Sequence, residues 1–198
     1  MQCKIALAAV FLAVCINTGA IAKNLISDGG FEKPVVGNGS EVGFNFGQNI
    51  GAWSVVGYLT GDPTQVSLVN RSYQKVGFTF NAHSGQQSLN LTNGDDGQHG
   101  VVQTVQTTAG TTYRLSFWAG TAYDPNNIFT SMGKVEAYVN GILLATAIVV
   151  GVPNTTTVNW QKFEVTFTAT SDHSQIMLVD GTILAGEVGL DDVELQAQ

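Results

Sequence analysis

Three carboxylates near the two ends of the chain are the residues whose types and spacing could do chemistry. Glu32 ends the segment Asn24–Glu32, and Asp191 with Asp192 lies in the segment Gly189–Leu195. Both segments are interpreted as short strands. The first and last strands of a β-sandwich commonly lie side by side, which would bring the three carboxylates together. Grouped carboxylate oxygens are the ligands that hard cations prefer. The sequence therefore predicts a cation site where the two ends of the chain meet.

The first 22 residues have the pattern of an export signal. Lys4 precedes the apolar run Ile5–Ile16, which is too short to span a bilayer comfortably. Ala20–Ala22 supplies the small residues of a signal-peptidase site. We expect residues 1–22 to be removed. Residues 23–198 would then be secreted to an extracellular, periplasmic or cell-surface location, without a membrane anchor. A retained anchor is the alternative.

Composition narrows the choice of partners. The chain has eight Lys and Arg against fifteen Asp and Glu, and its formal net charge is −7. An acidic surface with few scattered cations argues against nucleic acid or an anionic membrane as the partner. Both cysteines lie within the predicted signal, so the remaining domain must be stabilised by its core. A domain of this size can bury enough surface without disulfides.

The elements that must position these residues are predicted to be strands. Short runs alternate apolar and polar residues between clusters of Gly, Asn, Asp and Ser, and no long helical period is present. Asn140-Gly141 is a hairpin turn signal, whereas Lys33–Gln48 is predicted to be a long loop. We expect one all-β sandwich or jelly roll over residues 23–198. The clearest runs are Ser88–Thr92, Val101–Thr107, Thr112–Trp118, Lys134–Val139, Leu143–Val150, Phe163–Thr168, Gln175–Val179 and Val188–Leu195.

Alternation along the strands separates a core face from a second, polar and aromatic face. The second face carries Arg114, Trp118, Glu136 and Tyr138, with Asn90 nearby. Aromatic rings can stack on a sugar ring while charged and amide groups bind its hydroxyls, so we interpret these five residues as a glycan site. The alternative is that Trp118 belongs to a second hydrophobic layer. The predicted core comprises Leu89, Leu91, Tyr113, Leu115, Phe117, Val135, Val139, Phe163, Val165 and Phe167.

Several segments, taken together and in order, resemble the galactose-binding-like jelly rolls, which include families of carbohydrate-binding modules. The nearest match is the family of plant cell-wall proteins and bacterial relatives catalogued as domain of unknown function 642. The resemblance implies a structural calcium ion held by Glu32 and Asp191 or Asp192, with carbonyl groups of the loop His83–Gln87 completing its shell. The segments are Asn24–Glu32, Ala52–Val55, Ala82–Leu89, Gln103–Val105, Thr108–Tyr113, Leu115–Trp118, Trp160–Phe163 and Leu190–Val193.

These observations favour a secreted, non-catalytic module that binds an extracellular or cell-wall polysaccharide. An alternative is a matrix or adhesion protein that acts through extracellular protein partners. A glycoside-active enzyme is less favoured. Glu136 and Glu164 are the only carboxylates well placed on strands in the middle of the chain, and no nucleophile or catalytic-metal motif occurs in the sequence. We therefore expect the protein not to be an enzyme.

Overall fold

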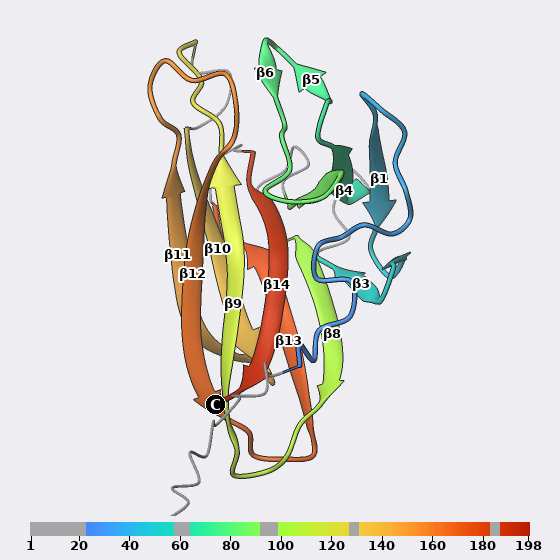
Figure 1. Ribbon diagram of the computed structural model, residues 1–198, viewed down its shortest axis with the longest axis vertical. Helices are drawn as coiled ribbons and strands as arrows, with labels where there is room; N and C mark the ends of the chain where they lie inside the picture. The colour runs from blue at the N-terminus through green and yellow to red at the C-terminus, as the bar shows by residue number, and fades with distance from the viewer. Residues whose placement is uncertain (1–22, 58–63, 92–98, 127–130, 183–186) are drawn as a thin grey trace, which may run out of the picture.

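A computed structural model describes most of the chain beyond the predicted signal (Figure 1). Within the described residues, no helix is long and apolar enough to cross a membrane. The predicted signal peptide lies outside these residues, so its removal stays a prediction. The described ranges are 23–57, 64–91, 99–126, 131–182 and 187–198.

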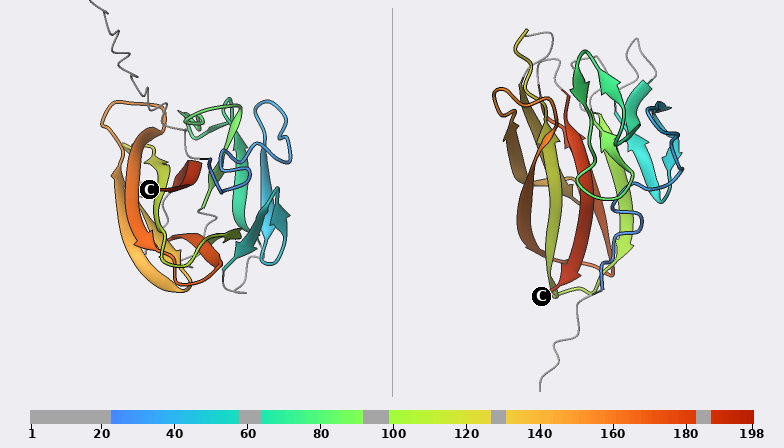
Figure 2. Two further views of the ribbon diagram at one scale, coloured as in Figure 1. Left: turned by 60° about the horizontal axis from the view of Figure 1, so that its bottom comes forward. Right: turned by 45° about the horizontal axis from the view of Figure 1, so that its top comes forward.

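Two six-stranded sheets pack face to face, as the two views in Figure 2 show. The first sheet has the order β1-β4-β7-β14-β9-β12 and the second β11-β10-β13-β8-β3-β2. The first sheet contains β1 Glu41–Asn45, β4 Thr64–Asn70, β7 Gln87–Asn90, β14 Gly189–Ala197, β9 Thr112–Thr121 and β12 Asn159–Thr168. The second contains β11 Ile142–Val150, β10 Met132–Val139, β13 His173–Asp180, β8 Gly100–Gln106, β3 Trp53–Val56 and β2 Asn49–Ile50. A separate hairpin pairs β5 Gln74–Lys75 with β6 Phe78–Thr79.

The predicted all-β sandwich is confirmed, and each of the eight predicted runs lies largely within one of the strands β7 to β14. The hairpin turn between β10 and β11 is also confirmed. Asn140 and Gly141 both have positive φ, 50° and 78°, as a type I′ turn requires. Local sequence therefore determines this connection, because Asn and Gly tolerate the left-handed conformation that other residues avoid.

Two expectations for the first part of the chain are wrong in detail. The predicted loop Lys33–Gln48 contains β1, which pairs with β4 at the edge of the first sheet. The segment Asn24–Glu32 is not a strand. It nevertheless lies along β14 as expected, since the N–H of Leu25 donates to the carbonyl of Leu195 at 2.8 Å. The two ends of the described chain are therefore adjacent, although only one of them is a regular strand.

The core lies between the two sheets and matches the predicted inward face. Every predicted core residue is buried there or packs against the buried cluster. On β9, Leu115 and Phe117 are almost fully buried. Rings from β9 and β12 stack within the layer, with Phe117 and Phe163 centroids 5.8 Å apart and Tyr113 and Phe167 centroids 5.9 Å apart. Apolar burial between the sheets is the main driving force for this arrangement.

A second hydrophobic cluster lies on the outer face of the first sheet. The β5–β6 hairpin, at the top of Figure 1, places Phe78 and Phe80 against this face. Trp160 of β12 packs against the same cluster. The hairpin therefore covers one end of the outer face, and this end becomes important for function below.

Candidate functional site

The three carboxylates predicted to meet do lie together, around Gly30. A Cβ atom built on Gly30 would lie 3.5 Å from Asp192 Oδ1, 3.8 Å from Asp191 Oδ1 and 3.9 Å from Glu32 Cγ. These are ordinary van der Waals distances, so the three side chains surround position 30 closely without overlapping it. We call Glu32, Asp191 and Asp192 the carboxylate cluster.

The loop that follows β6 binds the carboxylate cluster through its main-chain N–H groups. The N–H of Gln86 donates to Glu32 Oε1 at 2.8 Å. The N–H groups of His83 and Ser84 donate to Asp191 Oδ2 at 2.9 and 3.1 Å. Two segments more than 100 residues apart in sequence are thereby joined, and the loop is held against the first sheet.

Asp191 and Asp192 have different surroundings within the cluster. Asp191 is fully buried, and this burial raises its pKa to about 7, against the opposing hydrogen bond from the N–H of Ser84. Asp192 lies at a bulge of β14 with a positive φ of 46°. Its carboxylate lies 2.6 Å from His83 Nδ1 and accepts the Ser84 hydroxyl at 2.8 Å. The bulge thus turns consecutive side chains toward one loop.

The described residues of this cluster do not form a complete metal site by themselves. No group of three or more His, Cys, Asp or Glu in the described ranges is arranged to hold a metal ion. Both oxygens of Asp191 already accept main-chain N–H groups, whereas calcium takes six to eight oxygen ligands. The structural calcium implied by the resemblance therefore stays a prediction, and the hydrogen bonds explain how the cluster is held in the structure as described.

Trp118, predicted to stack on a sugar, stacks on a histidine. The Trp118 and His83 rings are nearly parallel at 17°, with centroids 3.7 Å apart. Trp160 also contacts His83, with ring centroids 6.2 Å apart in an edge-on arrangement. One face of Trp118 is thus covered by the protein. This is close to the alternative that Trp118 belongs to a second layer, and among the described residues the covering group is His83 in the loop after β6.

The structure does not bring the five predicted glycan residues together. Arg114 and Trp118 alternate with buried residues of β9 and so lie on the outer face of the first sheet. Glu136 and Tyr138 lie on the outer face of the second sheet, on the opposite side of the sandwich. The Tyr138 hydroxyl donates to Glu136 at 2.7 Å, which lowers the pKa of that carboxyl. The fifth residue, Asn90, is buried.

Glu164, the partner proposed for Glu136 in a glycoside-active enzyme, is also far from it in the fold. Glu164 lies opposite Ser116 on the first sheet, exposed beside Lys162 at 2.8 Å. Glu136 belongs to the second sheet and pairs with Lys134 at 3.0 Å. Two carboxylates on opposite outer faces cannot flank one glycosidic bond.

Asn90 belongs to a crevice that the sequence did not reveal. The crevice lies on the outer face of the first sheet, beneath the end of the β5–β6 hairpin. Its volume is about 10 Å³, which is space for roughly one water molecule. Its lining combines aromatic and aliphatic side chains with one amide and one carboxylate. The lining residues are Val69, Phe80, Ser88, Leu89, Asn90, Val158, Trp160, Glu187 and Gly189.

Glycines in two neighbouring strands let the Trp160 ring form one wall of this crevice. Gly120 of β9 lies opposite both Gly189 of β14 and Trp160 of β12. A Cβ on Gly189 would approach Trp160 Cη2 to 2.7 Å, and one on Gly120 would approach Cδ2 to 3.0 Å. The indole therefore lies close to bare backbone. Its Nε1–H donates to the carbonyl of Asn81 at 3.0 Å, which fixes the ring.

Glu187 is the ionisable group of the crevice. Its side chain is only 14 % exposed, and its Oε1 lies 3.0 Å from Nζ of Lys75 on the hairpin. Asn90 donates to the other carboxylate oxygen, and the Thr121 hydroxyl donates to the Glu187 main-chain carbonyl at 2.7 Å. A carboxylate held in this way beside aromatic rings can accept a proton or stabilise a positive charge.

Comparison with known proteins first defines the class of fold. The TmCBM61 module solved in complex with β-1,4-galactotriose aligns with a TM-score of 0.55 and 20 % identity, over 89 % of this chain and all of that one. A cyclase from Fischerella sp. TAU in complex with 4-(1H-indol-3-yl)butan-2-one aligns with a TM-score of 0.63 and 18 % identity, over 90 % of this chain and 98 % of that one. The chain is a jelly-roll β-sandwich of the kind seen in both.

The family is then shown by the sequence. The model of the HpiC1-like family, described as HpiC1 cyclase, matches residues 22–196, and the chain belongs to this family. No curated protein sequence matches it. The fold expected from the resemblance to galactose-binding-like jelly rolls is confirmed, whereas the matching family is not domain of unknown function 642.

The expectation that the protein is not an enzyme is wrong. The family that it belongs to is one of cyclases, and solved cyclases share its fold. The ionisable residue of the crevice, Glu187, was not singled out in the sequence because it lies in an irregular segment. The only signal available in the sequence was an acidic residue two positions before Gly189, and such a residue is common at the start of a strand.

Proposed function

We propose that the protein is a cyclase-type enzyme and that its reaction takes place in the crevice on the outer face of the first sheet. The observation that carries the proposal is membership of the HpiC1-like family over residues 22–196. The crevice supports it because one carboxylate, Glu187, lines the same space as the aromatic side chains of Phe80 and Trp160.

The residues of the crevice supply the interactions that an intramolecular ring closure needs. Ring closures commonly build up positive charge at carbon, and a carboxylate with little exposure to water stabilises such charge strongly. The faces of Phe80 and Trp160 add cation–π attraction. Glu187 can also accept the proton that is lost when the new ring becomes neutral. Asn90 orients the carboxylate through its amide N–H.

Substrate entry requires the Lys75 side chain to leave Glu187. The crevice as described is too narrow for an organic substrate. Lys75 reaches Glu187 from the β5–β6 hairpin, and its side chain is 50 % exposed. Because the lysine is half exposed, its ammonium can return to water when a substrate that carries or develops positive charge takes its place at Glu187. Lys75 then acts as a replaceable partner of the carboxylate.

The test uses the fact that an intramolecular cyclisation leaves molecular mass unchanged. The purified protein is incubated with a small-molecule extract of its source organism, and products are separated by chromatography with mass detection. We expect one compound to be replaced by an isomer of equal mass and different retention. The conversion should be lost in Glu187→Gln and kept in Glu164→Gln, which changes an exposed carboxylate of the same sheet. Equal activity of Glu187→Gln and the wild type would overturn the proposal.

A glycan is the second candidate ligand, and secretion remains part of the proposal. TmCBM61, which has this fold, was solved with β-1,4-galactotriose. On the first sheet, Arg114 donates to Gln196 at 2.8 Å beside the exposed Glu164, which gives a polar surface next to Trp118. Galactotriose therefore serves as a probe in the binding experiments. Binding that Trp118→Ala abolishes and Glu187→Gln leaves unchanged would favour this surface over the crevice.

A further inference from the structure

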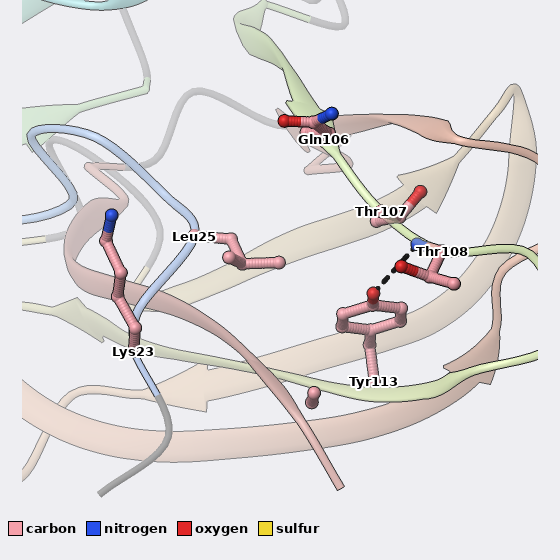
Figure 3. Close-up of a pocket in the computed structure, with 7 residues that line it drawn as sticks. Lys23, Leu25, Gln106, Thr107, Thr108 and Tyr113 are labelled. Carbon is pink, nitrogen blue, oxygen red and sulfur yellow. Dashed lines mark hydrogen bonds between the residues drawn. The ribbon is translucent and has the colours of Figure 1, made fainter.

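A second pocket lies at the end of the sandwich opposite the crevice. It is formed where β8 ends, β9 begins and β14 ends, near the C-terminus in Figure 1. The pocket has a volume of about 440 Å³, which is in the range of small-molecule sites. Its lining residues, drawn in Figure 3, are Lys23, Leu25, Gln106, Thr107, Thr108, Tyr113 and Ala197.

The lining has one charge and an apolar floor. Lys23 contributes an ammonium group, and none of the described lining residues is acidic. Within the described ranges, no carboxylate forms an ion pair with Lys23, in contrast to Lys75, Lys134 and Lys162. Figure 3 shows the Leu25 side chain between Lys23 and Tyr113. A ligand that spans the pocket therefore meets a cation at one side and apolar surface in the middle.

Hydrogen bonds within the protein determine what Tyr113 can offer. The Tyr113 oxygen accepts the N–H of Thr108 at 2.9 Å, as drawn in Figure 3. Because one lone pair of that oxygen is engaged, the hydroxyl hydrogen is the group left to donate toward a ligand. The Thr107 hydroxyl is already engaged, donating to the carbonyl of Ser171 at 3.1 Å and lying 3.0 Å from Ser174 Oγ. Hydrogen bonds within the protein thus hold the pocket wall in place, and the Tyr113 hydroxyl is the group that can donate to a ligand.

The charged groups just outside the pocket do not cancel the positive charge that Lys23 gives it. Asp172 lies next to the wall, because its carbonyl accepts the N–H of Thr107 at 2.8 Å. Its carboxylate is exposed and paired with His173 at 3.0 Å. In a chain of net charge −7, an anion finds few places where a cation and a hydroxyl donor flank apolar surface. The pocket is one of them.

We propose that this pocket binds a small amphipathic carboxylate, with its head group at Lys23, its apolar body over Leu25 and Ala197, and an acceptor facing the Tyr113 hydroxyl. The side-chain ammonium of Lys23, which becomes the N-terminal residue once residues 1–22 are removed, suits a carboxylate head group. The site is separate from the proposed cyclase crevice, at the opposite end of β9 and β14.

Octanoate is the probe for this site, and octyltrimethylammonium carries the same chain with the opposite charge. Binding is measured by calorimetry on the protein secreted by its host, with the N-terminus read by mass spectrometry. We expect octanoate to bind and the cation not to bind. Lys23→Gln should weaken octanoate binding about fivefold, as expected for a partly exposed ion pair. The control Lys33→Gln, which also removes an exposed lysine charge, should bind as the wild type does.

Tyr113→Phe separates a role in binding from a role in folding. The variant keeps the ring that stacks on Phe167 and removes the hydroxyl together with the hydrogen bond that it accepts from the N–H of Thr108, so octanoate binding by the variant reports whether the pocket wall is intact. We expect weaker binding of 7-hydroxyoctanoate, which carries an acceptor at its far end, and little change for octanoate. Equal binding of octanoate by the wild type and Lys23→Gln would overturn the proposal. So would binding of octyltrimethylammonium as tight as that of octanoate.

Discussion

The Asp191 carboxylate accepts the main-chain N–H of His83 at 2.9 Å, across 108 positions of sequence. This contact joins the last strand to the loop after β6, and that loop also leads to the Asn81 carbonyl that fixes Trp160. The carboxylate cluster and the crevice are therefore mechanically connected through one short segment. A substitution of Asp191 should therefore change both the free energy of unfolding and the position of the Trp160 ring.

The first prediction concerns pH. Burial raises the pKa of Asp191 from 3.8 to about 7, so the folded protein binds this proton more tightly than the unfolded chain does. The stability associated with Asp191 is complete below about pH 4 and is lost as the pH rises through about 7, by at most about 4 kcal/mol. We expect the free energy of unfolding of the wild type to fall over this range relative to that of Asp191→Asn.

Urea denaturation of both proteins from pH 4.5 to 8 measures this difference. Asp172→Asn is the matched control, because Asp172 is exposed and its pKa is lowered by His173. Its stability relative to the wild type should not show the same loss near pH 7. Parallel curves for the wild type and Asp191→Asn would contradict the assignment of a buried, proton-binding Asp191.

The second prediction concerns the glycine beneath Trp160. A Cβ at position 189 would lie 2.7 Å from Trp160 Cη2, so Gly189→Ala must displace the indole from the sheet. We expect a loss of about 1–3 kcal/mol of stability, as for other overpacked sites, and loss of cyclase activity as well. Gly110→Ala, at an open turn with φ of 82°, is the control: it also costs stability but leaves the crevice and the activity intact. Full activity of Gly189→Ala would show that the wall formed by Trp160 is not needed.

Strand alternation explains both what could be predicted from the sequence and what could not. Alternation on β9 and β10 identified the buried residues, because burial between two sheets imposes a period of two. It also assigned Trp118 and Glu136 to an outer face. A sandwich has two outer faces, however, and the period of two does not distinguish them. The predicted glycan site therefore combined residues from opposite sides of the molecule.

The short elements before β7 were missed for a different reason. The strands β2, β5 and β6 have two residues each, which is too short to show any period. Their positions depend on long-range packing, such as that of Phe80 against the first sheet. The crevice depends on the same packing, since Lys75 and Phe80 both come from the hairpin region. The carboxylate cluster was predictable because Glu32 and Asp191 lie in segments that adjoin in most sandwiches with this chain order.

The third prediction concerns the calcium ion that the resemblance implies. Carboxylates gathered around Gly30 would provide acidic ligands if main-chain N–H groups released some of their oxygens. We expect added calcium to raise the melting temperature, because a ligand that binds only the folded state stabilises it. A chelator should reverse the effect. Glu32→Gln should remove the calcium-dependent rise in melting temperature. Glu194→Gln, which changes a carboxylate of β14 outside the cluster, should retain it. A melting temperature that changes with neither calcium nor chelator would contradict the prediction of a structural calcium ion.

The last prediction separates the roles of the two charges at the crevice. Lys75 and Glu187 form one ion pair, yet the proposed mechanism needs only the carboxylate. Lys75→Met keeps most of the unbranched side chain and removes its ammonium group, so it should leave Glu187 available to a ligand. We expect Lys75→Met to bind tryptamine, a probe that joins an indole to an ammonium group, about threefold more tightly than the wild type, because the probe no longer competes with the lysine for Glu187. Glu187→Gln should bind it more weakly.

Nuclear magnetic resonance titration of the tryptophan side-chain N–H signals measures both affinities, since Trp160 lines the crevice. Lys75→Met should cost about 1–3 kcal/mol of stability, because Glu187 is only 14 % exposed and loses its cationic partner while it keeps the Asn90 amide. If Lys75→Met weakened binding as much as Glu187→Gln, the intact ion pair would be the recognition element, and Lys75 would be a ligand contact instead of a displaceable partner.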